Sequence, residues 1–271
     1  MRERALEIAA QRPRALDGRN LLREYLQSRI LGALQEAGAM VPLAFMGGTA
    51  LRFLYRQPRF SEDLDFTLER AADDFSFSSL AERVVRQLER EGYELNARVG
   101  DTGAVVRAWF AFGGLLADAG LSPHADEVLK VLLEVDTRPP AGAVLEVSVV
   151  DRFGPLRLQH HDLSSLYAGK ITAVLARPYT KGRDLYDLMW YLTRTPSIEP
   201  NAVLLTNSLT QVAPDVVAEA EADWRTAVRA RLARVDWYDA RRDLASFLEQ
   251  SRDVDLIEAA TFEQLLQGSS L

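Results

Sequence analysis

Two glycines, Gly47 and Gly48, stand between a short apolar run at residues 41–45 and a helical pattern at residues 50–56. The apolar run predicts a buried strand, so the chain passes here from strand to helix through a turn without side chains. Glycine lets backbone N–H groups approach a ligand closely, and a helix N-terminus carries unsatisfied donors at the positive end of its dipole. The segment therefore predicts a phosphate-binding turn, to which Thr49 adds a hydroxyl donor.

Two aspartates, Asp63 and Asp65, follow in a segment at residues 63–68 that alternates with period two, as a half-buried strand does. Their side chains are expected to leave one face of that strand, roughly 6.5–7 Å apart along the backbone. Two carboxylates this close repel each other and are stabilised by a divalent cation. Oxygen ligands favour Mg²⁺ or Mn²⁺. Such a pair alone is usually a solvated strand edge, but after the glycine turn it predicts a site for a nucleoside triphosphate (NTP) and its metal.

Composition places this site in a globular chain without thiol chemistry. The 271 residues are 48% hydrophobic and 26% charged, which is typical of a soluble protein with a full core, and they include no cysteine. No apolar run approaches the ~20 residues of a membrane helix, and residues 1–20 lack the apolar region of a signal peptide. We therefore expect a cytoplasmic protein with no membrane partner. The net charge of −7 argues against broad binding to a phosphate backbone but allows a local basic groove.

The periodicity predicts an α+β chain with an α/β domain at residues 1–160 and a helical domain at residues 161–271. The first domain is expected to hold a mixed sheet with flanking helices. Its strands include a hairpin and a second strand pair. The expected helices lie at residues 21–35, 50–56, 79–91 and 163–176, the expected hairpin at 93–99 and 104–112, and the second pair at 128–136 and 143–149.

Four motifs in this chain resemble a known family. Residues 47–56 read GGTALRFLYR, residues 59–66 read RFSEDLDF, residues 166–175 read LYAGKITAVL and residues 183–188 read RDLYDL. Together they resemble the AbiEii family of nucleotidyltransferase toxins, which includes the MenT toxins. The resemblance spans roughly residues 40–192 and implies a DNA polymerase β-type nucleotidyltransferase core.

The resemblance implies a third carboxylate and a lysine in the site. Members of the superfamily use a further acid from a neighbouring strand as metal ligand and proton acceptor. Glu134 and Asp136 share one face of the strand expected at residues 128–136, and the family pattern favours Glu134, with Asp136 in reserve. Lys170 lies in an otherwise apolar helix, where a lysine commonly extends to solvent. The resemblance instead implies that its ammonium binds the triphosphate.

Further charged residues complete the expected nucleotide site. Asp184 and Asp187 lie three residues apart on one helical face, where acids of a first helical turn also interact well with the dipole. Asp184 is expected to orient Lys170 or contact the nucleotide, with Asp187 in reserve. Arg52 is expected to contact the nucleotide, with Arg59 in reserve, because arginine binds phosphate in a bidentate manner.

The expected reaction is transfer of a nucleoside monophosphate from ATP or another NTP to an acceptor hydroxyl. The glycine turn holds the phosphates, the three carboxylates hold Mg²⁺ or Mn²⁺, and Lys170 neutralises the pyrophosphate. The resemblance implies the 3′ end of tRNA as acceptor, action as a toxin, and a cognate antitoxin as partner. Two other functions stay open: an antibiotic-type enzyme with a small-molecule acceptor, and a non-catalytic nucleotide-binding interaction module.

Overall fold

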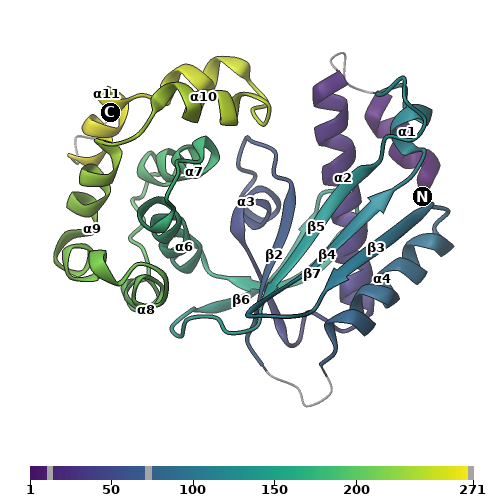
Figure 1. Ribbon diagram of the computed structural model, residues 1–271, viewed down its shortest axis with the longest axis horizontal. Helices are drawn as coiled ribbons and strands as arrows, with labels where there is room; N and C mark the ends of the chain where they lie inside the picture. The colour runs from purple at the N-terminus through teal and green to yellow at the C-terminus, as the bar shows by residue number, and fades with distance from the viewer. Residues whose placement is uncertain (11–14, 71–74, 268–271) are drawn as a thin grey trace. The chain divides into compact units, whose positions relative to one another are not determined.

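The computed structural model describes residues 1–10, 15–70 and 75–267, which form two compact units (Figure 1). The first unit contains Met1–Arg56, Phe60–Pro139 and Glu146–His160. The second contains the chain from His161 onward together with two short segments, Gln57–Arg59 and Pro140–Leu145. Both segments lie within the range that the sequence assigns to the α/β domain.

A seven-stranded mixed sheet forms the centre of the first unit, in the order β3-β4-β5-β2-β1-β7-β6. β2 runs parallel to β5 and β1 parallel to β7, whereas β1–β2, β3–β4 and β4–β5 are antiparallel. The strands are β1 (Leu43–Met46), β2 (Asp63–Leu68), β3 (Leu95–Gly100), β4 (Val105–Phe112), β5 (Leu129–Asp136), β6 (Leu145–Asp151) and β7 (Pro155–His161).

The pairing of these strands confirms one sequence prediction and corrects another. β3 and β4 form the expected hairpin, with Gly103 at φ 98° in the turn between them. The expected pair of residues 128–136 with 143–149 is wrong: β5 lies between β4 and β2, so both of its edges are occupied, and β6 is at the far edge of the sheet. There β6 neighbours β7, a strand that the periodicity did not reveal.

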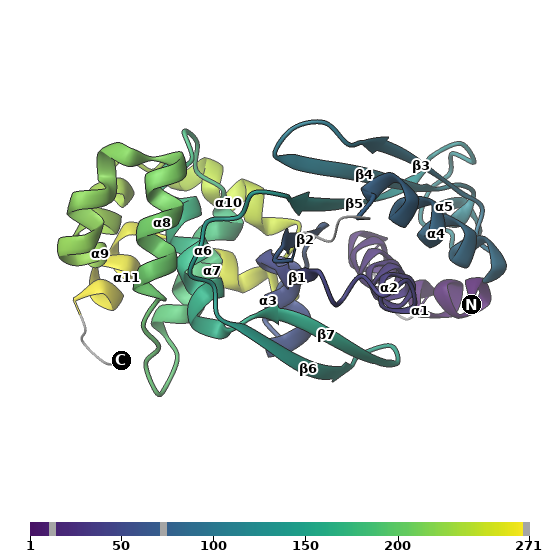
Figure 2. The ribbon, with the colours of Figure 1, turned by 90° about the horizontal axis from the view of Figure 1, so that it is seen from below.

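Helices cover one face of the β3–β4–β5 part of the sheet. The helices of this unit are α1 (Arg2–Ala10), α2 (Ala15–Glu36), α3 (Gly47–Tyr55), α4 (Phe77–Arg90) and α5 (Leu115–Asp118). Figure 2 shows α2 and α4 on the same side of these strands, and both helices contact them. Alternate residues of β4 and β5 are buried, among them Phe110 and Leu133, because they face this helical layer. The intervening residues form the opposite, more polar face.

The second unit is helical. Its helices are α6 (Leu163–Ala176), α7 (Gly182–Leu192), α8 (Ala202–Val212), α9 (Val217–Leu232), α10 (Trp237–Ala245) and α11 (Ala259–Leu266), with short 3₁₀ turns at Pro214–Val216 and Ser251–Leu256. α6 has the bounds expected from the sequence, and the Asp162 side chain caps it by accepting a bond from the Ser165 backbone N–H. The core of this unit includes the stacked rings of Tyr167 and Tyr191, with centroids 4.1 Å apart. Among the described residues, no helix has the length and apolarity that crossing a membrane requires.

Candidate active site

The two aspartates occupy alternate positions at the start of β2. Leu64 and Phe66, which alternate with them, are buried in the core, while Asp63 and Asp65 are half-buried on the other face. The strand has the bounds and the alternation expected from the sequence. Its pleat therefore presents both carboxylates on one face.

The glycine turn lies directly against the second of these carboxylates. β1 ends at Met46, the antiparallel partner of Asp65, and α3 begins at Gly47 with φ 77°. A Cβ atom at Gly47 would overlap Oδ2 of Asp65, so the position requires glycine both for its backbone angle and for this contact. The Asp65 carboxylate and the glycine turn are thus adjacent, at the positive end of the α3 dipole.

Thr49 has a different role from the one expected. Its side chain is fully buried, and its hydroxyl donates a short hydrogen bond to the backbone carbonyl of Asp63. Because its single donor is used in this way, Thr49 ties the first turn of α3 to the start of β2. This bond holds the carboxylate pair against the glycine turn.

The third carboxylate lies beside the pair in the register of the sheet. Glu134 on β5 is the parallel Cα partner of Asp65, whereas Asp136 is partnered with Thr67, two residues farther along. Partners in a ladder present their side chains on the same face, so Glu134 is the nearer of the two acids to Asp65. The Nε of Arg107, the partner of Glu134 on β4, donates a hydrogen bond to its Oε1. The sequence reasoning overlooked Arg107, although the alternation of residues 105–112 places it on this face.

The donor set fits a divalent cation, although its three carboxylates do not converge. Among the residues that the structure describes, no three His, Asp or Glu side chains surround a position for a metal. Asp63 and Asp65 present two carboxylates on one strand face, and Glu134 presents a third on the neighbouring strand; carboxylate oxygens are the hard donors that such a cation prefers.

Arg52 takes part in a buried ion cluster within the first unit. Its side chain is 3% exposed, and Nη2 lies 3.0 Å from Oε2 of Glu24, a carboxylate that also forms an ion pair with Arg152. The ring of Phe60 stacks on its other side, 4.6 Å from the guanidinium carbon. The structure therefore gives Arg52 a partner inside the core, where the sequence suggested a nucleotide.

In the second unit, Lys170 belongs to a cluster with Asp184 and Asp187. Its Nζ lies 3.1 Å from Oδ1 of Asp184 and 2.7 Å from Oδ2 of Asp187. Asp187 is fully buried and also accepts hydrogen bonds from Arg59, whose Nε lies 2.6 Å from its Oδ1, and from Gln57. The expected orientation of Lys170 by Asp184 is present in this geometry. The bond between Arg59 and Asp187, 128 residues apart, was not predicted.

Mutual attraction keeps this cluster ionised. Burial works against the charge on Asp187, but Arg59 and Lys170 outweigh it and lower the pKa of the carboxyl to about 2. Burial likewise works against the charge on Lys170, but Asp187 and Asp184 outweigh it and raise the pKa of the ammonium above its ordinary value. Lys170 is therefore a cation that two carboxylates hold in place.

A known protein family and two solved structures are similar to this chain. Residues 29–267 match the family described as nucleotidyl transferase AbiEii toxin of type IV toxin–antitoxin systems. The fold is similar to that of MenT4, a nucleotidyltransferase toxin from Mycobacterium tuberculosis H37Rv, with 20% identity, a TM-score of 0.51, and coverage of 99% of this chain and 98% of that chain. JHP933 from Helicobacter pylori is 22% identical over 90% of this chain and 94% of its own, with a TM-score of 0.46. No curated protein sequence matches the chain.

The family match extends well beyond the four motifs, through the α8–α11 region, where the sequence reasoning found no motif. The likeness to MenT4, at 20% identity, concerns the fold. The family match shows a nucleotidyltransferase, a class that uses an NTP and, in general, a divalent metal. The chain belongs to the AbiEii family of nucleotidyltransferase toxins of type IV toxin–antitoxin systems.

Proposed function

We propose that this toxin transfers a nucleoside monophosphate from an NTP to the 3′-hydroxyl of tRNA, with Mg²⁺ or Mn²⁺ held by Asp63 and Asp65. The observation that carries the proposal is the contact of the Asp65 carboxylate with Gly47. It joins a metal-binding pair to a helix N-terminus whose backbone N–H groups bind phosphate. A site of this kind suits an NTP whose phosphates share oxygens with the metal.

Each residue then has a defined task. The metal, when bound, neutralises phosphate charge and lowers the pKa of the attacking hydroxyl. The N–H groups of the glycine turn orient the phosphates, while Thr49 keeps β2 against that turn. The acceptor oxygen bonds to the α-phosphorus, pyrophosphate leaves, and the hydroxyl proton passes to Glu134, the carboxylate beside Asp65 in the register.

Lys170 and Asp184 have a proposed role that comes from the family pattern. We propose that Lys170 neutralises triphosphate charge and that Asp184 orients it, which agrees with their separation of 3.1 Å. Lys170→Gln should then raise the KM for NTP. Because the variant also leaves Asp187 with one cation fewer, its thermal unfolding is measured alongside. A raised KM at temperatures where the variant stays folded would support the triphosphate role, and an unchanged KM would remove it.

The proposal is tested by incubating the purified chain with total tRNA, Mg²⁺ and each of four α-labelled NTPs in turn. Asp63→Ala should abolish labelling of tRNA. Asp151→Ala, which removes an exposed acid at the end of β6, should leave it unchanged. Label on a small molecule but not on RNA would instead identify the antibiotic-type enzyme, and NTP binding without any turnover would identify the non-catalytic module.

The toxin role follows from the family, and its dependence on this chemistry can be tested in cells. We propose that the protein acts in the cytoplasm, where NTPs and tRNA meet, and that a cognate antitoxin counteracts it. Induced expression should arrest growth, Asp63→Ala should remove the arrest, and co-expression of the antitoxin should relieve it. Arrest that persists in Asp63→Ala would show that toxicity does not arise from nucleotidyl transfer.

A further inference from the structure

The polar face of the sheet extends from the carboxylates on β2 across β5, β4 and β3. Cα partners in successive strand pairs define a row of residues across this face. Asp63 is the partner of Leu132, Leu132 of Trp109, and Trp109 of Arg98. Side chains of such partners project from the same face, so these four form one row across four strands. Neighbouring strands are about 4.8 Å apart, which places Trp109 about 10 Å from Asp63. Lys130 lies on the same face of β5, two residues before Leu132.

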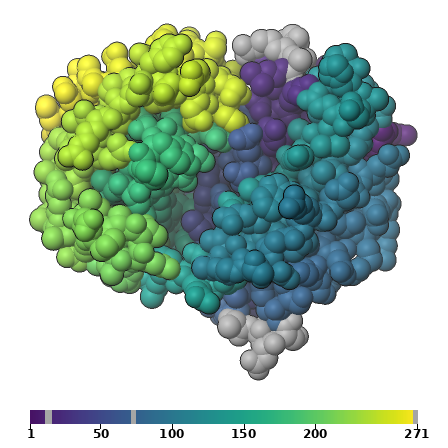
Figure 3. Space-filling view, viewed as in Figure 1, coloured from purple at the N-terminus to yellow at the C-terminus, as the bar shows by residue number. Residues whose placement is uncertain are grey.

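This row is accessible to a ligand. Arg98 and Lys130 are exposed, and Trp109 is half-buried. The helices α2 and α4 cover the opposite face of these strands, and in the view of Figure 1 the atoms of the strands reach the molecular surface (Figure 3). Among residues 1–10, 15–70 and 75–267, neither Arg98 nor Lys130 has an ion-pair partner, and the Trp109 ring has no aromatic or cationic partner. The only other cation of these three strands, Arg107, is bonded to Glu134.

We propose that this sheet face binds the single-stranded 3′ end of an RNA acceptor, with one base stacked on Trp109 and backbone phosphates bound by Arg98 and Lys130. The inference rests on the proposed function, because the row ends at Asp63. The terminal hydroxyl would lie at the carboxylates, and the preceding nucleotides would cross Leu132 toward the β3 edge.

The chemistry of the face favours a single strand over a duplex. An aromatic ring between cations binds single-stranded nucleic acid, because every unpaired base offers a flat surface for stacking. The bases of a duplex already stack on one another, so Trp109 would have no surface to contact. The charges are local in a chain of net charge −7, which suits a short strand end. Asp63, at the other end of the row, and Asp65 beside it repel phosphates, so the cations set the direction of the strand.

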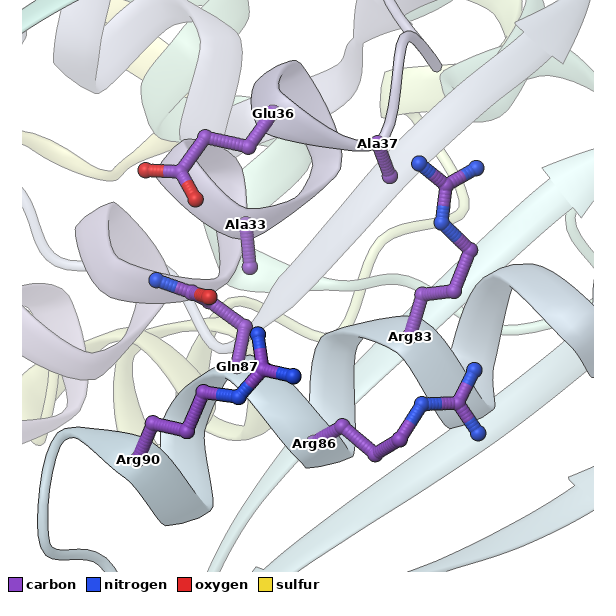
Figure 4. Close-up of a pocket in the computed structure, with 7 residues that line it drawn as sticks. All are labelled: Ala33, Glu36, Ala37, Arg83, Arg86, Gln87 and Arg90. Atoms are coloured by element: carbon purple, nitrogen blue, oxygen red, sulfur yellow. The ribbon is translucent and has the colours of Figure 1, made fainter.

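A second basic surface provides a matched control. A groove of about 400 Å³ between α2 and α4 is lined by Arg83, Arg86 and Arg90, and Glu36 is also among its lining residues (Figure 4). It lies on the helical side of the sheet, away from Trp109. Arg86 pairs with Glu82, whereas Arg83 and Arg90 are exposed and, among the described residues, have no ion-pair partner. Replacing Arg83 and Arg90 removes the same charge as replacing Arg98 and Lys130.

The experiment measures binding of a fluorescein-labelled single-stranded RNA to the full chain in EDTA, so that no turnover occurs. Trp109→Ala should weaken binding roughly tenfold or more, and Trp109→Phe should restore most of it. The double variant Arg98→Gln/Lys130→Gln should have a shallower slope of log Kd against log salt concentration. The slope should fall by about 0.7 for each phosphate that the variant no longer binds. Arg83→Gln/Arg90→Gln should leave both quantities close to wild type. A blunt duplex of the same sequence should compete poorly.

The outcomes separate this inference from the proposed function. Equal losses in the two double variants, or unchanged binding in Trp109→Ala, would overturn the sheet-face site even where labelling of tRNA depends on Asp63. No RNA binding by wild type together with label on a small molecule would overturn both. Selective loss in the sheet-face variants, with thermal unfolding unchanged, would establish the site.

Discussion

Gly47 is required in the glycine turn for two reasons, and alanine substitutions at Gly47 and Gly38 measure them separately. The first is its backbone angle, φ 77°, where a residue with a Cβ costs roughly 1–2 kcal/mol. The second is the contact with Asp65, whose carboxylate occupies the place of the new Cβ and must move. Gly38, in the turn before β1, has the same φ of 77° and no atom within 4 Å of an added Cβ. Gly38→Ala therefore measures the backbone cost alone.

Both variants should lose about 1–2 kcal/mol of unfolding free energy in urea at unchanged m-value, and Gly47→Ala should lose more. A shift of the carboxylate by about 1 Å should reduce nucleotidyl transfer by about 100-fold in Gly47→Ala. Gly38→Ala should keep full transfer. In an Asp65→Ala background the extra stability loss at Gly47 should disappear, because the displaced carboxylate is gone.

Two results would refute this reasoning. The first is a Gly47→Ala variant that transfers nucleotide at the wild-type rate and is no less stable than Gly38→Ala. The second is an extra stability loss at Gly47 that persists after Asp65 is removed. Either would mean that the turn and the carboxylate adjust independently, and that the contact does not define the site.

Three further outcomes follow from the charged clusters. Asp187→Asn removes the buried negative charge that Arg59 and Lys170 share and should cost about 3–5 kcal/mol, seen as a fall in Tm on the order of 10 °C. The pKa of Asp187 is about 2 in the folded protein and 3.8 ordinarily, so the stability that its charge contributes is present above about pH 4 and is lost toward pH 2. Acid unfolding of wild type and of Asp187→Asn measures this difference. Glu134→Gln should reduce transfer by roughly 100-fold or more, whereas Asp136→Asn should have a small effect; the reverse order in kcat would make Asp136 the third carboxylate.

Local patterns predicted the parts of the site that depend on neighbouring residues. The period-two alternation of residues 63–68 set the bounds of β2 and placed both aspartates on one face, because a strand has only two faces. The Asp162 cap likewise predicted the start of α6, since the cap bonds a residue three positions on. The glycine turn was predicted by the absence of side chains between an apolar run and a helix.

Contacts between residues far apart in the chain could not be predicted in this way. The bond of Arg52 with Glu24 and that of Arg59 with Asp187 each join complementary charges, but a chain with 32 cations and 39 acids offers many equivalent pairings. The position of β6 was missed for a related reason. Alternation shows that a segment is a strand, but it does not show which edge of the sheet the segment joins.

The register of β5 links the stability of this sheet to its chemistry. β5 is paired on both edges, and its buried residues, such as Leu133, fix which face is directed to α2 and α4. The same alternation directs Glu134 to the side of Asp65. A slip of one residue would move the apolar set out of the core and turn the acid into it, so the register that stabilises the fold is also the one that places Glu134 beside Asp65. Selection for a well-packed β5 and selection for the site therefore act on one property of the strand.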